Sequence, residues 1–380
     1  MRQNGPDPAH PFARTLTALP PVYAAADRSL KRLQRTITAA IEPKRPRDNS
    51  RMNTVGSFPP LSEIEAELRV VRLPLRTRFR GLKHREIALV RGPEGWTEFS
   101  PFLEYAAPAS AAWLRAALDY GWNAQPMAQR DQIPVNATVP AVAPRAVAAI
   151  LASYHGCRTA KVKVAERGQN LIDDVERCTE VRRILGPEGR LRVDANGGWN
   201  LDQAEHAIHA LAGLDLEYVE QPCARVDELT ELRRRVKYLG IPIAADESVR
   251  HASDPLLVAR AHAADLLVLK AQPLGGVRRA LNLAAETGLP TVVSSALESS
   301  VGLAMGAALA AALPELPFDC GLGTASLLAE DVTENPLRPV EGSIVVSRVE
   351  VSESLLARHA VAPERVAWWR ARVRDAYALL

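Results

Sequence analysis

Four charged side chains recur at nearly constant intervals along the 380-residue chain, each at the end of a short apolar segment. Asp194 follows residues 191–193, and Glu220, Asp246 and Lys270 follow later segments at intervals of 26, 26 and 24 residues. A single aspartate in such a position is more often a turn-capping residue. The recurrence instead predicts a βα repeat, in which each strand presents one functional group at its carboxyl end.

Two further charged residues lie in the preceding apolar segment, 159–164, which has the sequence TAKVKV. Because strand side chains alternate between faces, Lys161 and Lys163 share one face and the valines share the other. The valine face suits packing against helices, so both lysines are predicted to point inward. The same alternation turns the four strand-end groups inward. Burying so many charges costs more than apolar filling, which favours a functional site over structural ion pairs.

The chemistry of this set follows from its donor atoms. Asp194, Glu220 and Asp246 offer carboxylate oxygens without a His or Cys among them, and such hard donors suit Mg²⁺, with Mn²⁺ as an alternative. A carboxylate substrate bound to that cation has a more acidic neighbouring C–H, because the developing negative charge falls on the metal. Lys163 and Lys270 would flank the substrate. Burial and nearby cations lower the pKa of a lysine and so favour the neutral amine, which can act as a base. The set therefore predicts proton abstraction next to a carboxylate.

The elements that must position these groups are the strands and helices of a (β/α) barrel. Each predicted strand but the last is followed by a helical pattern, and eight parallel strands of this kind close into a TIM-like barrel with its site at the carboxyl ends. The strands are predicted over residues 135–142, 159–164, 190–193, 216–220, 241–246, 265–270, 291–295 and 318–321. The longest apolar run, 301–313, is too short to span a bilayer and is predicted to be a helix packed on the barrel.

The chain is longer than a bare barrel requires, and its flanking regions predict a second, α+β domain. The predicted division is a disordered N-terminal extension over residues 1–60, a small domain over 61–132, the barrel over 133–325, and a C-terminal segment over 326–380 that returns to the small domain. The extension is rich in Pro and Arg and has no signal-peptide core.

Within the small domain, residues 61–74 and 86–90 are predicted to form strands of an antiparallel meander. The basic segment 75–85 between them is predicted to be an exposed loop. Alanine-rich residues 106–120 are predicted to be helical. Residues 339–351 are predicted to form a hairpin that returns to this domain, before a final helix.

Composition excludes several classes of protein. The net charge of +3 arises from residues 1–52, which hold ten Arg or Lys against four Asp or Glu, so the remainder is slightly acidic and no nucleic-acid partner is expected. The four cysteines are scattered without a CxxC pair, which predicts reduced thiols in a cytoplasmic protein. We expect a small-molecule carboxylate as the partner and no membrane insertion. The oligomeric state stays open.

The motifs KVK, VDANGGW, VEQP, ADES and LKAQPLGG, in this order, resemble the enolase superfamily and specifically its muconate-lactonising subgroup. The resemblance covers residues 61 to about 380. It implies an enolase-type barrel with a capping domain formed by N-terminal and C-terminal segments, and it implies that the three carboxylates bind the metal. It also implies that Lys163 is the acid/base group on one substrate face, Lys270 its counterpart on the other, and Lys161 an electrostatic partner.

Several activities share these motifs. The segment FDCGLGT has one aspartate, Asp319, whereas dipeptide epimerases carry Asp-x-Asp there, which counts against them. The segments NATVPAV, FRG and SSALESSVG most resemble the o-succinylbenzoate synthases of actinobacteria. That resemblance implies Mg²⁺-dependent syn-dehydration of 2-succinyl-6-hydroxy-2,4-cyclohexadiene-1-carboxylate to 2-succinylbenzoate, in menaquinone synthesis. An N-acylamino acid racemase is the alternative. A barrel that served only as a binding or scaffold protein would lack one of the metal-ligating carboxylates or one of the lysines, and all of them are present here.

Small polar and glycine residues near the strand ends are predicted to contact the substrate or to support the residues that do. For the glycines, a role as turn formers stays open, and for the asparagines a supporting position behind the substrate contacts is equally consistent with the sequence. These candidates are Asn136, Asn196, Ser294, Ser295, Gly321 and Gly323.

Overall fold

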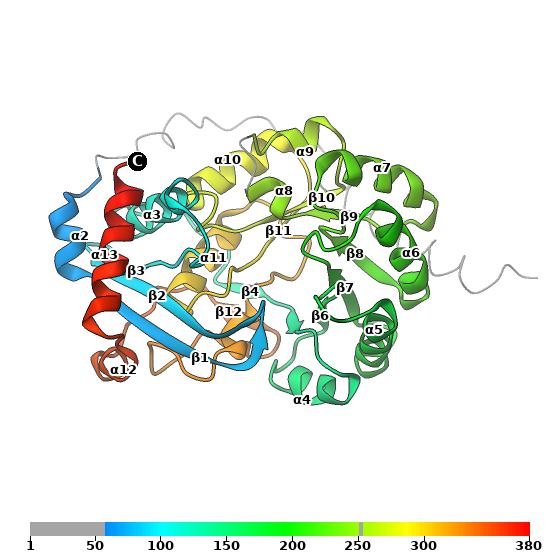
Figure 1. The fold of residues 1–380 in the computed structure, drawn as a ribbon, viewed down its shortest axis with the longest axis horizontal. Coiled ribbons are helices and arrows are strands. Elements are labelled where there is room, and N and C mark those ends of the chain that lie inside the picture. The colour runs from blue at the N-terminus through cyan, green and yellow to red at the C-terminus, as the bar shows by residue number, and fades with distance from the viewer. Residues whose placement is uncertain (1–57, 251–253) are drawn as a thin grey trace, which may run out of the picture.

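The strands that end in charged residues lie side by side in one curled parallel sheet (Figure 1). The computed structural model describes residues 58–250 and 254–380, so the predicted extension lies, apart from residues 58–60, outside the described residues. The seven-stranded sheet has the order β11-β10-β9-β8-β7-β6-β5, and neighbouring strands are parallel. Its strands are β5 Ala137–Val139, β6 Thr159–Lys163, β7 Arg190–Asp194, β8 Leu216–Glu220, β9 Ile243–Ala245, β10 Leu266–Leu269 and β11 Thr291–Val293.

The eighth predicted strand, 318–321, is reduced to single parallel bridges. Cys320 pairs with Val135, and Gly321 pairs with Ser294. The backbone N–H of Gly321 donates to the Val293 carbonyl at 2.8 Å. The prediction was therefore wrong about a continuous strand but right about its place, because these residues join β11 to the start of β5. A side chain at position 321 would collide with Ser294, which explains why this close approach uses glycine.

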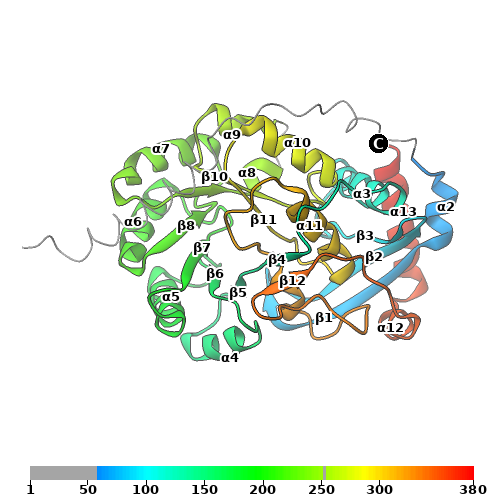
Figure 2. The same ribbon diagram turned by 180° about the vertical axis from the view of Figure 1, so that it is seen from behind.

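Helices cover the outer face of the sheet (Figure 2). Asparagine side chains begin two of them: Asn170 accepts hydrogen bonds from the N–H groups of Ile172 and Asp173, and Asn200 accepts one from Gln203. Gly186, in the left-handed region at φ 69°, ends the first of these helices. The barrel helices are α4 Val147–Ala152, α5 Leu171–Leu185, α6 Leu201–Leu211, α7 Val226–Val236, α8 Glu247–Arg250, α9 Leu257–Arg260, α10 Val277–Thr287 and α11 Ser300–Ala312, with 3₁₀ turns η1 Pro144–Ala146, η2 Ala212–Leu214, η3 Lys237–Leu239 and η4 Gly323–Leu327.

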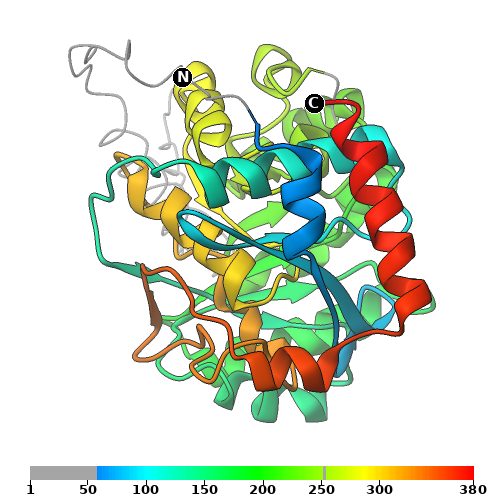
Figure 3. The same ribbon diagram turned by 90° about the vertical axis from the view of Figure 1, so that its left-hand side faces the viewer.

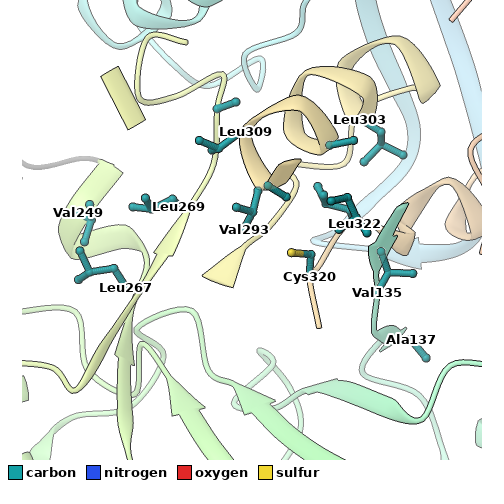
Figure 4. Close-up of a cluster of buried hydrophobic side chains, with 14 of the residues drawn as sticks. Val135, Ala137, Val249, Leu267, Leu269, Val293, Leu303, Leu309, Cys320 and Leu322 are labelled. Atoms are coloured by element: carbon teal, nitrogen blue, oxygen red, sulfur yellow. The ribbon is translucent and has the colours of Figure 1, made fainter. Parts of the chain in front are cut away.

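Helix α11 is apolar around its whole circumference because protein covers it on several sides. It contacts β11 and α10 of the barrel and also β3 of the small domain. Figure 4 shows Leu303 and Leu309 of this helix among the buried side chains around Val293 and Leu322. The helix predicted over the apolar run is confirmed. Nowhere in residues 58–250 and 254–380 does a helix combine the length and apolar character needed to cross a membrane.

The small domain is assembled from both ends of the described chain. A three-stranded antiparallel sheet, β1 Arg69–Phe79, β2 Leu82–Gly92 and β3 Gly95–Phe99, packs with α2 Leu61–Glu67 and α3 Ala107–Trp122. The C-terminal helix α13 Pro363–Tyr377 contacts α3, α2 and β1, and α12 Glu353–His359 contacts β1. Figure 3 shows α13 beside α2 and α3. The end of the C-terminal segment, helices α12 and α13, therefore packs on this domain.

Two predictions for this domain are wrong in detail. The strand predicted over residues 61–74 begins as helix α2, because Leu61, Ile64 and Leu68 recur at helical rather than strand spacing. The segment 75–85 is a hairpin and not a loop, although its charged side chains other than Arg85 are exposed, as predicted. Strands β1 and β2 extend along it to a tight turn at residues 80–81, and this hairpin leaves Phe79 and Arg85 buried.

The predicted hairpin over residues 339–351 is also corrected. The turn at Glu341 and Gly342 is present, and Val340 bridges to Ser343. However, β12 Ser343–Val345 pairs with β4 Gln132–Pro134, next to the start of the barrel, rather than joining the small domain. This pairing satisfies the backbone of an otherwise isolated strand.

A buried carboxylate ties the small domain to the barrel. Glu98 of β3 accepts hydrogen bonds from the hydroxyl and the N–H of Ser299, at 2.5 and 3.1 Å, and from the N–H of Gly302, at 3.1 Å. From β2, Arg85 Nε donates to the Leu297 carbonyl at 3.1 Å. These partners lie between β11 and the first turn of α11. The small domain is thereby fixed over the carboxyl ends of the strands.

Glu86 of β2 holds the two ends of the chain together. Its carboxylate accepts hydrogen bonds from Arg72 on β1 at 2.7 Å, and from Arg365 and Trp369 on α13 at 2.7 and 3.0 Å. Burial raises the pKa of Glu86, but the hydrogen bonds from Trp369, Arg72 and Arg365 outweigh it and hold the pKa below its usual range. The ionised carboxylate therefore stabilises the folded state.

We predict that Glu86→Gln lowers the free energy of unfolding at pH 7 by about 1–3 kcal/mol, the usual effect of disrupting a buried charged hydrogen-bond network. Because the folded pKa is lowered, this stabilisation is present above the unfolded pKa and is lost as the pH falls through the folded pKa. Urea unfolding at several pH values should show the difference from wild type shrinking in acid. Glu65→Gln, which removes a surface pair with Arg374, is the matched control and should cost under about 1 kcal/mol. Equal losses in both variants would contradict the assignment.

Candidate active site

A cavity lies at the carboxyl ends of the barrel strands, beneath the β1–β2 turn of the small domain. The strand ends contribute most of its charged groups, and the turn contributes an aromatic ring and a guanidinium. It is lined by Phe79, Arg80, Thr138, Lys161, Lys163, Asp194, Asn196, Lys270, Ser294, Ser295, Ala296, Leu297, Gly321 and Thr324. The position between two domains, at this end of a barrel, is where ligand sites are usually built.

Neighbouring strands place the first charged side chains in register. Lys163 of β6 is aligned with Asp194 of β7, which is aligned with Glu220 of β8. The Lys161 Nζ lies 2.9 Å from Glu220 Oε1 and 3.2 Å from Asp194 Oδ2, and the Lys163 Nζ lies 2.6 Å from Asp194 Oδ2. All four side chains are buried and point inward, as the strand alternation predicted.

The third carboxylate is held from two directions. The Lys270 Nζ lies 2.5 Å from Asp246 Oδ2, and the Arg250 Nε lies 3.0 Å from Asp246 Oδ1. The Gln221 side chain fixes the backbone here, because its Oε1 accepts from the N–H groups of Asp246 and Ser248 at 2.9 and 3.1 Å. In strand order, the three carboxylates therefore stand between Lys163 on one side and Lys270 on the other.

The buried charges shift one another's pKa. Burial lowers the pKa of Lys163 despite the nearby Asp194 carboxylate, and the Lys161 ammonium adds to the lowering. Burial also acts on Lys161, but Glu220 and Asp194 outweigh it and raise the pKa of Lys161 well above its usual range. Of these two lysines, Lys163 therefore releases a proton more readily, and Lys161 stays an ammonium.

The donor set fits a hard divalent cation. Burial and the negative charges of Asp194 and Asp246 raise the pKa of Glu220 to about 7, which shows that the three carboxylates repel one another. All the donors are carboxylate oxygens, the ligands that Mg²⁺ prefers. As they stand, however, no three His, Cys, Asp or Glu side chains in the described ranges are arranged to hold a metal ion. The carboxylates face ammonium groups instead, so a cation would compete with the lysines for these oxygens.

Four of the six predicted substrate contacts lie at the cavity: Asn196, Ser294, Ser295 and Gly321. The Asn196 Oδ1 accepts a hydrogen bond from Lys163 Nζ at 2.6 Å, and the Ser295 hydroxyl lies 2.7 Å from the Thr324 hydroxyl. The Gly321 N–H already donates to the Val293 carbonyl, so this group is engaged within the barrel, and the contact of Gly321 with substrate stays a prediction.

Asn136 and Gly323 do not line the cavity. The fully buried Asn136 donates to the Ala137 carbonyl at 2.8 Å and accepts from Arg192 at 3.1 Å. The strand register puts Asn136 below the reacting layer, since Thr138, two residues on, is aligned with Lys161. A side chain at Gly323 would meet the Asn136 carbonyl, so this glycine serves packing.

Asp319, the acid of the predicted eighth strand, lies at the opposite end of the barrel. Its carboxylate accepts from the Thr159 hydroxyl at 2.5 Å and pairs with Arg190 at 3.5 Å, and both partners begin their strands. The residue is therefore remote from the strand ends that carry the lysines. This position agrees with the sequence argument against a dipeptide epimerase.

Several cavity residues were not singled out as contacts from the sequence. Arg80 and Phe79 come from the segment predicted to be a loop, and their signal was the FRG motif at the turn. Thr138 could have been found from strand alternation, because it lies two residues after the candidate Asn136 and so on the same face. The contact between Arg250 and Asp246 could not be predicted from the spacing of charged residues, because Arg250 belongs to a helix of only four residues.

Fold and site together define an enolase-type barrel with a capping domain. Residues 143–350 match the family described as enolase C-terminal domain-like, and residues 70–121 match the one described as enolase N-terminal domain-like. Among solved structures, the muconate lactonising enzyme from Pseudomonas putida is similar with a TM-score of 0.63 and 20% identity, covering 77% of this chain and 98% of that one. An N-succinyl Arg/Lys racemase from Bacillus cereus gives a TM-score of 0.64 and 21% identity, over 78% of this chain and 97% of that one.

Relatives with higher sequence identity identify the family within this superfamily. The chain is 58% identical over 313 residues to the o-succinylbenzoate synthase of Thermobifida fusca, which covers 82% of this chain and 96% of that protein. It is 52% identical over 321 residues to the o-succinylbenzoate synthase of Mycobacterium ulcerans, over 84% of this chain and 96% of that protein. The chain belongs to the o-succinylbenzoate synthase family of the enolase superfamily.

A divalent cation that binds the three carboxylates should stabilise the folded protein. With free Mg²⁺ at about 100 times its Kd, we predict a gain of about 2.7 kcal/mol in the free energy of unfolding. Asp194→Asn removes one ligand and should abolish most of the gain. Calorimetric unfolding with Mg²⁺ against EDTA measures it, and Asp319→Asn, at the opposite end of the barrel, should keep the gain. A gain of wild-type size in Asp194→Asn would show that the cation binds elsewhere.

Proposed function

We propose that this chain catalyses the Mg²⁺-dependent syn-dehydration of 2-succinyl-6-hydroxy-2,4-cyclohexadiene-1-carboxylate to 2-succinylbenzoate, a step of menaquinone biosynthesis. The observation that carries the proposal is the placement of Lys163 and Lys270 on either side of three buried carboxylates, in a chain 52–58% identical to o-succinylbenzoate synthases. The four cysteines are unpaired, which supports a cytoplasmic setting.

The three carboxylates Asp194, Glu220 and Asp246 would hold the Mg²⁺. When bound, the cation would stabilise the negative charge that develops on the substrate carboxylate as the neighbouring C–H loses its proton. Lys161 supports this arrangement from below, because its ammonium lies 2.9 Å from Glu220 and opposes the rise in the pKa of that carboxyl group. The raised pKa of Lys161 favours its ammonium form, so we assign it the role of a cation and not that of the base.

Lys163 is the proposed base. Its pKa is lowered by burial, which favours the neutral amine that a base requires, and Asn196 accepts a hydrogen bond from its nitrogen at 2.6 Å. The amine takes the proton from the carbon that bears the carboxylate. The resulting ammonium then protonates the hydroxide that leaves from the adjacent carbon on the same face. The C–H and C–O bonds break, water departs, and the electron pair completes the aromatic ring.

Lys270 performs the complementary task on the other face. Its ammonium is held by Asp246 at 2.5 Å and needs only to remain positive near the ring of the intermediate. The succinyl carboxylate is proposed to contact Arg80 of the capping turn and the hydroxyl of Ser294, since both line the cavity. Arg80 suits this role because a guanidinium binds carboxylates in a planar, two-pronged manner.

The alternative is an N-acylamino acid racemase, which requires a proton donor and acceptor on both faces of the substrate. The symmetry of two lysines, each paired with an aspartate, is the feature that favours it. The fold neighbour from Bacillus cereus is an N-succinyl Arg/Lys racemase, although its 21% identity supports the fold alone.

Two assays with purified full-length protein separate these functions. We predict that the diene acid is converted with a kcat/KM at least about tenfold above that for racemisation of an N-acyl amino acid, a difference of about 1.4 kcal/mol in barrier. EDTA should abolish the conversion and Mg²⁺ should restore it. Asp194→Asn, treated identically, is the inactive control. Racemisation without measurable dehydration would overturn the proposal.

A further inference from the structure

Glu247 follows Asp246 directly and joins the two sides of the site, although neither the motif analysis nor the reaction scheme uses it. Its Oε1 accepts a hydrogen bond from the Asn196 Nδ2 at 3.1 Å and another from the Arg250 Nη2 at 2.6 Å. Asn196 in turn accepts from Lys163 at 2.6 Å. A continuous path therefore runs from Glu247 through one amide to the amine that acts as base.

The two ends of the Asn196 amide are chemically different, and this difference makes the path directional. The oxygen end can accept a hydrogen bond from Lys163, whereas the nitrogen end can only donate. A carboxylate at the nitrogen end fixes the amide so that its oxygen faces Lys163. Without that carboxylate, the amide can rotate and turn its N–H groups towards the lysine. The lysine nitrogen would then lose an acceptor that orients it.

The backbone at Asn196 supports the same arrangement. Its φ of 47° lies in the left-handed region, which asparagine tolerates better than most residues, and its N–H donates to Asp194 Oδ1 at 3.0 Å. The turn therefore fixes where the side chain starts. What remains free is the rotation of the amide, and Glu247 is the acidic residue that contacts it.

Glu247 is itself anchored from the capping domain. The Arg250 side chain, which contacts both Glu247 and Asp246, also donates to the Tyr105 hydroxyl at 3.0 Å. The second oxygen of Glu247, Oε2, is buried and has no hydrogen-bond partner among the described residues. A buried carboxylate oxygen without a partner is destabilising.

We propose that Glu247 is a positioning residue for the reaction, which orients the base Lys163 by fixing the amide of Asn196. The inference rests on the proposed role of Lys163. It assigns to the glutamate of the ADES segment a task separate from that of its neighbour Asp246.

The first test is the kinetics of Glu247→Met, which keeps the length of the side chain but removes the acceptor. We expect kcat for the diene acid to fall about 10–100-fold, with KM within about twofold, as is typical when a partner behind an active-site residue is removed. Glu247→Gln keeps an acceptor oxygen and should lose clearly less. Glu188→Met, on the exposed loop between α5 and β7, is the matched control and should behave as wild type. Equal losses in Glu247→Met and Glu247→Gln would overturn the proposal.

A double-mutant cycle tests whether the effect passes through Asn196. Asn196→Gly removes the amide while glycine accepts the left-handed backbone. If Glu247 acts through this amide, adding Glu247→Met to Asn196→Gly should lower kcat no further than about twofold. Losses that multiply in the double variant would show that Glu247 acts by another route, and the proposal would be wrong.

A third measurement does not depend on the substrate. Crystal structures of wild type and Glu247→Gln should keep the Lys163 nitrogen within hydrogen-bond distance of Asn196 Oδ1, and Glu247→Met should lose that contact. An unchanged contact in Glu247→Met would overturn the positioning role even if the variant were inactive. If wild type does not dehydrate the diene acid, the proposed function fails, while this comparison still decides the role of Glu247. Should Glu247→Met not fold, Glu247→Ala takes its place in all three experiments.

Discussion

The burial of three carboxylates with three ammonium groups at one end of the barrel is the constraint on which the rest of the structure depends. Each buried ion costs several kcal/mol unless it is paired, so none of these side chains can be placed alone. Lys163 on β6 and Asp194 on β7 meet because parallel strands align residues at the same level, and Lys161, two residues earlier on the same face, reaches Asp194 at 3.2 Å. The cluster keeps Lys161 charged while Lys163 is driven towards the neutral form. Two lysines separated by one residue thereby acquire different chemistry.

The two-domain architecture follows from the need to enclose this cluster. The open end of the barrel is covered by the β1–β2 turn, and the capping sheet is tied down through the buried Glu98 and its partners at the start of α11. Because α13 packs on α2, α3 and β1, the capping domain is built from segments that lie far apart in the described sequence. Glu86, which binds Arg365 and Trp369, makes this closure sensitive to a single carboxylate. Packing far from the cavity thus supports the geometry inside it.

Much of the barrel and its charged centre could be predicted because charged residues recur along the sequence at nearly constant intervals. Charged residues recurring after apolar strands fixed which face each strand turns inward, and the structure places Lys163, Asp194 and Lys270 at one cavity. The position of a side chain along the barrel axis was harder to predict, because strand alternation determines which face a residue is on but not how close it lies to the carboxyl end of the strand. Asn136 therefore faces inward but lies below the site, whereas Thr138 lines it. Helix α2 and the shortened eighth strand were missed because both are short, and tertiary contacts decide them more than local pattern does.

The central claim is that the two lysines on either side of the carboxylates do different work, and replacing each by arginine tests it most directly. Lys270 needs only to stay positive near the ring, and arginine is also a cation that stacks on π-systems, so Lys270→Arg should retain measurable dehydration. Lys163 must give up its proton, which an arginine does not do near neutral pH, so Lys163→Arg should abolish dehydration. Turnover of the diene acid should be measured in both variants, with Mg²⁺ and substrate binding checked separately. If Lys270→Arg lost dehydration as completely as Lys163→Arg while binding both normally, the one-base account would be contradicted.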